Sequence, residues 1–194
     1  MKTPITRVLT YMVLVLAVAA SWPLLGAPVQ NEERKETFTM VAMPTKGAAR
    51  TMIDFTMRLN EFTTDQETME LIEVLREGGT DALRSTLEKV QKGKLTPKGR
   101  IGADVAVARV RKTEKGERFI VITARTIPGL ELYASGRSRD YPFSWFEFEI
   151  DEKGELVDMG TFIMAVRLRF NKEGQFEIEK YGIQPYKLTN IIRW

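Results

Sequence analysis

Three short segments share one construction, and they constrain the fold of this 194-residue chain more than any other feature. Thr113-Glu-Lys-Gly116, Asp151-Glu-Lys-Gly154 and Asn171-Lys-Glu-Gly174 each place a side-chain oxygen three residues before a glycine. Such an oxygen accepts hydrogen bonds from backbone amides, and the glycine adopts the left-handed conformation that closes a bulged hairpin. The sequence therefore predicts three β-hairpins with positive φ at all three glycines.

Strand-like segments flank these turns. Two segments of alternating apolar and polar residues, 37–43 and 50–62, precede the turns and predict half-buried strands. Around and after the turns the predicted strands are 103–111, 119–125, 143–150, 156–165, 162–170, 175–181 and 186–192. Because 156–165 and 162–170 share residues, neighbouring hairpins share strands, which predicts a meander.

The segment between the two groups of strands predicts helices. Thr64 and Glu67 have the spacing of a capping box, and Gly78-Gly79 is typical of a helix end. Thr80 or Asp81 then begins a second predicted helix that ends before Gly93, followed by a linker at 94–102. The apolar residues expected to face the sheet are Leu71, Ile72, Leu75, Leu83 and Leu87.

Together these patterns predict an α+β fold. We expect an antiparallel meander of about seven or eight strands, either strongly curved or barrel-like, with a two-helix insertion packed on it. Residues 37–194 are expected to form one globular α+β domain, and 28–36 a flexible lead-in.

The first 27 residues have the layout of a secretory signal. Lys2 and Arg7 precede a short apolar run, and cleavage is expected after Ala20 or Ala27. An uncleaved signal anchor is the alternative, although Pro23 interrupts the helix that it requires. The sequence therefore predicts export to the periplasm or the cell exterior, with membrane contact only through an uncleaved signal.

Composition excludes several chemistries. The sequence contains no Cys and no His, which excludes disulfides, Cys nucleophiles, Ser–His–Asp catalysis and His-ligated zinc. Lys153 and Lys172 occupy positions where a calcium loop needs oxygen ligands. Acidic and basic residues are balanced and mixed, so nucleic acid is not an expected partner. We expect no metal and no cofactor.

Two segments in the C-terminal half of the sequence resemble a known group of proteins. Asp140-Tyr-Pro-Phe143 and the ending Gln184-Pro-x-x-Leu-Thr-Asn190 resemble a group of exported bacterial proteins of uncharacterised function. The resemblance implies export and a single domain, and it implies no activity.

Two clusters are candidates for a site. Arg137 and Arg139 flank Ser138 shortly before Tyr141 and Trp145, a cationic and aromatic group suited to a carboxylate, phosphate or sugar. Glu147 and Glu149 share one face of a predicted strand and are weaker candidates for a glycosidase-like acid and base. A solvated outer face and an exposed loop are the alternative interpretations.

The aromatic and Met residues of the predicted strands are compatible with two arrangements of the protein interior. They either line an apolar ligand cavity inside a barrel or interdigitate with the helical stripe as a dry core. They are Phe38, Met40, Phe55, Met57, Phe146, Phe148, Phe162 and Met164.

The five-residue loop of the last predicted hairpin, 171–175, sets one register for its two strands. In this register apolar residues lie opposite apolar residues on one face, and cations lie opposite anions on the other. The expected pairs are Phe170 with Phe176, Leu168 with Ile178, Arg169 with Glu177, and Arg167 with Glu179.

Three functions follow from these observations. The first is an exported, non-enzymatic interaction or envelope-associated module with an unknown protein or small-molecule partner. The second is a small barrel-like carrier of an apolar or anionic ligand, and the third is a carboxylate-based hydrolase. A cavity favours the carrier, and convergent carboxylates in a cleft favour the hydrolase.

Overall fold

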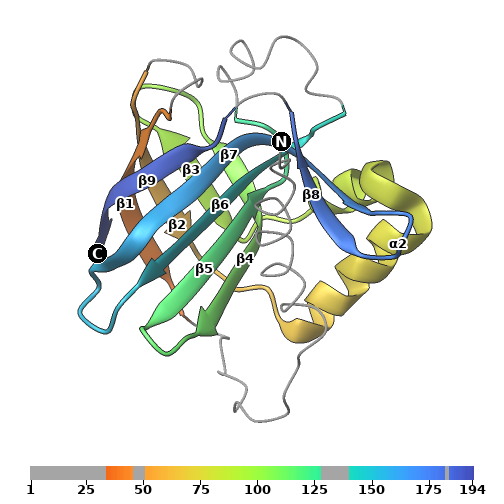
Figure 1. The fold of residues 1–194 in the computed structure, drawn as a ribbon, viewed down its shortest axis with the longest axis horizontal. Helices are drawn as coiled ribbons and strands as arrows, with labels where there is room; N and C mark the ends of the chain where they lie inside the picture. The colour runs from red at the N-terminus through yellow and green to blue at the C-terminus, as the bar shows by residue number, and fades with distance from the viewer. Residues whose placement is uncertain (1–33, 46–50, 128–139, 182–183) are drawn as a thin grey trace, which may run out of the picture.

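The computed structural model describes residues 34–45, 51–127, 140–181 and 184–194 (Figure 1). These residues form nine antiparallel strands and one helix. The elements are β1 (Glu36–Met43), β2 (Ile53–Leu59), α2 (Asp65–Leu87), β3 (Gly93–Pro97), β4 (Ala103–Lys112), β5 (Glu117–Thr123), β6 (Phe143–Ile150), β7 (Leu156–Phe170), β8 (Phe176–Lys180) and β9 (Tyr186–Arg193). None of the described helical residues form a segment long and apolar enough to cross a membrane.

Eight of the strands close into a barrel. The strands pair in the order β6-β5-β4-β3-β2-β1-β9-β7-β8, and an additional pairing of β6 with β7 completes the ring. Strand β8 lies outside the ring, because it pairs only with the C-terminal half of β7. The predicted α+β fold with a barrel-like antiparallel sheet is therefore confirmed. The predicted linker at 94–102 is wrong, because β3 pairs with β2 and β4 there.

The three predicted hairpin turns are confirmed. Gly116, Gly154 and Gly174 have φ of 154°, 82° and 74°. The Asp151 carboxylate accepts backbone hydrogen bonds from Lys153 and Glu155 at 2.9 and 2.8 Å. Asn171 accepts the equivalent bonds from Glu173 and Gln175, and the Thr113 hydroxyl accepts bonds from the amides of Lys115 and Gly116. The expected register of the last hairpin is also confirmed at all four pairs.

The predicted pair of helices is not confirmed. The structure has one helix, α2, which begins at the predicted Thr64 capping box. Gly79 inside it has non-helical backbone, with φ 67° and ψ −165°, so two helical segments meet there at a kink, at the position of the predicted helix end. Thr80, immediately after this interruption, donates a buried hydrogen bond from its hydroxyl to the Leu168 carbonyl of β7 at 2.8 Å. This bond ties the interruption in α2 to the outside of the barrel.

Two apolar clusters form the core. The first fills the barrel and contains the eight aromatic and Met residues singled out from the sequence. The second lies between α2 and the outer face of the barrel, where Leu75, Leu83 and Leu87 pack with Trp145 and Leu168, among others. The aromatic residues therefore pack against one another inside the barrel, while the helical stripe covers the outside. Figure 1 shows α2 beside the barrel, next to β8.

Candidate functional site

Aromatic rings fill the barrel interior. Phe146 and Phe162 stack with centroids 4.3 Å apart, and Phe119 and Phe148 stack at 5.1 Å. Phe38 contacts the second pair edge to face. All of these rings are at most 2% exposed. Rings in mutual contact occupy the space that a ligand in the centre of the barrel requires.

The acidic residues of β6 are neutralised by a neighbouring strand. Arg118 of β5 donates to the Glu149 carboxylate at 2.8 Å and lies 3.8 Å from the carboxylate of Glu147. Thr113 donates a further hydrogen bond to Glu149 at 2.7 Å. The hydrogen bond from Thr113 is the largest cause of a lowered pKa of Glu149, and the bond from Arg118 lowers it further. A glycosidase acid requires a raised pKa, so this arrangement suits a salt-bridged sheet surface better than acid–base chemistry.

The predicted cationic and aromatic cluster is only partly described. Arg137 and Arg139 lie outside the described residues. Tyr141 is partly buried and donates its hydroxyl proton to the Glu179 carboxylate at 2.6 Å, which raises the Tyr141 pKa. Trp145 is only 8% exposed and packs under α2. The structure therefore does not bring Tyr141 and Trp145 together on one surface.

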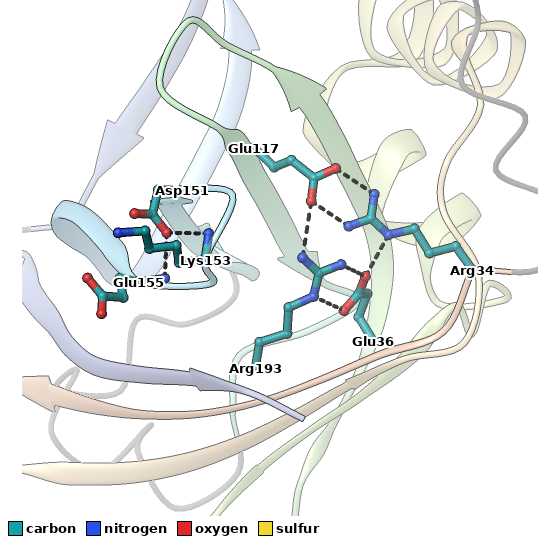
Figure 2. Close-up of polar contacts among 7 residues, drawn as sticks. All are labelled: Arg34, Glu36, Glu117, Asp151, Lys153, Glu155 and Arg193. Atoms are coloured by element: carbon teal, nitrogen blue, oxygen red, sulfur yellow. Dashed lines mark hydrogen bonds and ion pairs between the residues drawn. The ribbon is translucent and has the colours of Figure 1, made fainter.

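A chain of alternating charges closes one end of the barrel (Figure 2). Arg34 donates two hydrogen bonds to the Glu117 carboxylate, at 2.8 and 2.6 Å, and one to Glu36 at 2.5 Å. Arg193 donates to the same two carboxylates, through a bidentate contact to Glu36 and a 3.3 Å bond to Glu117. Two cations and two anions thus bring β1, β5 and β9 together, and we refer to these four residues as the terminal charge network.

The terminal charge network is ordered by burial and by aromatic rings. The Glu36 side chain is only 5% exposed. The Arg34 guanidinium lies 5.6 Å from the centroid of the Phe62 ring and 5.8 Å from that of Phe119, which are cation–π distances. The hydrogen bonds from Arg34 lower the pKa of Glu117, and Glu117 in turn raises the pKa of Arg34. Both carboxylates are occupied by guanidinium groups, so the network is a structural closure of the barrel.

Next to the terminal charge network, strands β7 and β9 separate from each other. Their recorded pairing covers Phe162↔Tyr186 to Gly160↔Leu188 and stops there. Beyond that point, within the described residues, β7 is paired only with β6, and β9 continues to Arg193 paired only with β1. A Cβ on Gly160 would come within 3.0 Å of the Leu188 Cβ on β9, so glycine permits the last close approach before β7 and β9 diverge.

A backbone irregularity in β9 accompanies the parting. Asn190 has φ of 49°, the only positive φ outside glycine among the described residues. The β1–β9 register shifts at this point, because Thr39 pairs with Ile192 while Val41 pairs with Thr189. One extra residue on β9 is a β-bulge, and a bulge bends its strand and increases the local twist. The bulge therefore turns the end of β9 away from the direction that continued pairing with β7 requires.

The parting leaves an open groove. Its lining is the β6–β7 turn on one side and the end of β9 on the other, comprising residues 152–156 and 189–194. Ile192 is 52% exposed and Trp194 76% exposed, and Met159 of β7, at 55%, lies next to Gly160. These three are among seven large apolar side chains that are exposed in the described part of the chain. We refer to this feature as the β7–β9 groove.

Sequence reasoning missed both the terminal charge network and the β7–β9 groove. Residue 34 was assigned to a flexible lead-in, and its carboxylate partner Glu117 lies 83 residues away. Isolated charged residues carry no sequence signal for such a pairing. For the groove, the unusual ending of the chain, in which Asn190 precedes two isoleucines and Trp194, was the only indication.

Comparisons with protein-family models, with curated proteins and with solved structures found no match.

Proposed function

We propose that this protein is an exported, non-enzymatic interaction module that binds its partner at the β7–β9 groove. The observation that carries the proposal is the exposure of Ile192 and Trp194 in the groove, on the part of β9 that has no partner on its β7 side within the described residues. Exposed apolar side chains close together on a surface are typical of an interaction site. The stacked rings inside the barrel support this function over the carrier, and the Arg118 pairing of Glu149 supports it over the hydrolase.

Export is the second part of this proposal. It rests on Lys2, Arg7 and the apolar run that follows them. Expressed in a secreting bacterium, the protein is expected to have a mature N-terminus between Ser21 and Val29. An intact Met1 found in the membrane fraction by N-terminal sequencing would contradict export and support the anchor.

Site-specific photo-crosslinking in the cells that naturally produce the protein tests the binding site. A benzophenone side chain at position 192 lies in the groove, whereas one at the equally apolar Ile101 lies on the turn between β3 and β4. Position 101 is the matched control, because Ile101 is 77% exposed and does not line the groove. We expect a discrete protein adduct from position 192 alone, which excess wild-type protein suppresses and excess Ile192→Lys protein does not.

Two results would count against the proposed function. Identical adducts from positions 192 and 101 would mean that the groove has no particular partner. An apolar molecule retained in stoichiometric amount by the native protein in mass spectrometry would favour the carrier.

A further inference from the structure

We propose that the β7–β9 groove binds an extended polypeptide segment of a partner protein, which adds as a strand along the free edge of β9. This inference rests on the proposed function and specifies the chemistry of the partner. Strand addition to a sheet edge is an established mode of peptide recognition, in which backbone hydrogen bonds give affinity and alternate side chains give specificity.

The backbone of β9 offers the hydrogen-bonding groups. The Trp194 amide donates to the Thr37 carbonyl of β1 at 2.9 Å, so this amide faces β1. In an extended strand, successive amides face opposite sides, so the Arg193 amide faces away from β1. Continued pairing would set Met159 of β7 opposite Thr189, but the recorded pairs stop one residue earlier, at Gly160↔Leu188. The edge of β9 beyond Leu188 therefore has no strand partner within the described residues.

The last residues of β9 present two exposed apolar side chains at this edge. Natural edges use β-bulges, inward charges, prolines or covering segments to hinder pairing. The bulge at Asn190 therefore confines strand addition to the residues after it, where the inward charge of Arg193 is neutralised by Glu36 and Glu117. Here Ile191 and Arg193 alternate with Ile192 and Trp194, and the second pair is exposed on the outside of the barrel. An added strand places alternate side chains next to Ile192 and Trp194, which favours apolar residues at those positions.

Charge at the groove indicates which residues flank this apolar segment. Arg193 is already engaged by Glu36 and Glu117 in the terminal charge network. Within the described residues, the carboxylates of Glu152 and Glu155, which line the groove, form no ion pair, and Lys153 is the one ammonium group in the lining. Two carboxylates against one ammonium favour a segment with basic residues at its ends.

The arrangement of β9 reduces the cost of binding. The guanidinium of Arg193 is held by two carboxylates, and the indole of Trp194 donates to the Thr39 hydroxyl at 3.2 Å. Both side chains at the end of β9 are thus anchored to β1 and β5. An edge that is already extended loses less conformational freedom when a partner strand pairs with it.

A fluorescein-labelled peptide with alternating Val and Thr and a Lys at each end is the probe for this edge. We expect fluorescence polarisation to detect its binding to the full chain with a Kd below about 1 mM. A counterpart with N-methylated backbone amides keeps every side chain and removes hydrogen-bond donors. Its binding, and that of a peptide with Glu in place of each Lys, is expected to be at least about tenfold weaker.

Protein variants locate the site. Ile192→Lys is expected to weaken binding of the Lys-flanked peptide at least about tenfold, and Ile101→Lys, which adds the same charge elsewhere, to leave it unchanged. Trp194→Lys serves as a second test, because Trp194 is 76% exposed and its loss spares the core. Circular dichroism checks that all three variants are folded.

Several outcomes overturn strand addition. Equal affinity for the N-methylated peptide would mean that the side-chain surface alone binds, and the crosslinked adduct at position 192 would still support the proposed function. Failure of the Lys-flanked peptide to bind would also overturn it. A dimer in sedimentation analysis that Ile192→Lys dissociates would assign the edge to a second copy of this chain.

Discussion

Replacing Glu117 by Gln tests the terminal charge network. Glu117 accepts hydrogen bonds from Arg34 at 2.8 and 2.6 Å and from Arg193 at 3.3 Å, and Gln keeps only one acceptor oxygen and no charge. Hydrogen bonds to charged groups contribute about 1.5–3 kcal/mol, and exposed ion pairs below about 1 kcal/mol. The Arg34 and Glu117 side chains are each 22% exposed, so we expect Glu117→Gln to lower the free energy of unfolding by about 1–2 kcal/mol at pH 7.

The effect of Glu117→Gln is expected to depend on pH. The hydrogen bonds from Arg34 lower the pKa of Glu117 in the folded chain. The resulting stabilisation is complete above the pKa of glutamate in the unfolded chain, about 4.3, and is lost as the pH falls through the lower pKa of the folded state. The difference in unfolding free energy between wild type and variant should therefore shrink on acidification from neutral pH.

Urea unfolding followed by circular dichroism, at several pH values from about 7 to 3, measures this difference. Glu173→Gln is the matched control, because Glu173 is an exposed glutamate of the last turn and the substitution removes the same charge. A destabilisation no larger than that of Glu173→Gln, or one that stays constant across the pH range, would refute the role assigned to the network.

Three further substitutions test the fold. Leu83→Ala is expected to cost about 2–5 kcal/mol in thermal or urea unfolding, because Leu83 is only 4% exposed between α2 and the barrel; a neutral result would mean that α2 is not packed there. Gly174→Val should cost about 1 kcal/mol or more, because φ is 74° at that turn, and Glu173→Val one residue earlier is its control. Gly160→Ala should destabilise the protein, because the new Cβ meets Glu147 and Phe148 of β6 at 2.8 Å, and should raise amide exchange of β9, because it meets the Leu188 Cβ at 3.0 Å; unchanged exchange in β9 would contradict the close approach of β7 and β9 at Gly160.

Local chemistry explains what was predictable from the sequence. The turns at Thr113, Asp151 and Asn171 are determined by one side-chain oxygen and one glycine a few residues apart, so they form in the same way in any sheet. The register of the last hairpin follows from its turn and from its side-chain pattern. A one-residue slip would turn Leu168 and the other apolar side chains of the inner face toward solvent. The capping box at Thr64 is equally local.

Long-range pairing explains what was not predictable. The barrel closes because β9 pairs with β1 across most of the chain, and no pattern within either strand encodes its partner. The polar segment Gly93–Pro97 contains two residues typical of loops, yet it is a strand because β2 and β4 supply pairing on both sides. The sequence groups Trp145 with Tyr141 because both follow Arg137 and Arg139 closely, whereas in the structure Trp145 lies under α2.

The terminal charge network and the β7–β9 groove are two consequences of how one strand ends. Beyond Leu188, β9 pairs with β1 alone within the described residues, so extended structure there depends on contacts other than a second sheet neighbour. Arg193 supplies such contacts from the inner face, through Glu36 and Glu117. The same residues that close the barrel therefore hold the end of β9 in place after the bulge at Asn190, with its β7 side unpaired, which is the arrangement that an added strand requires.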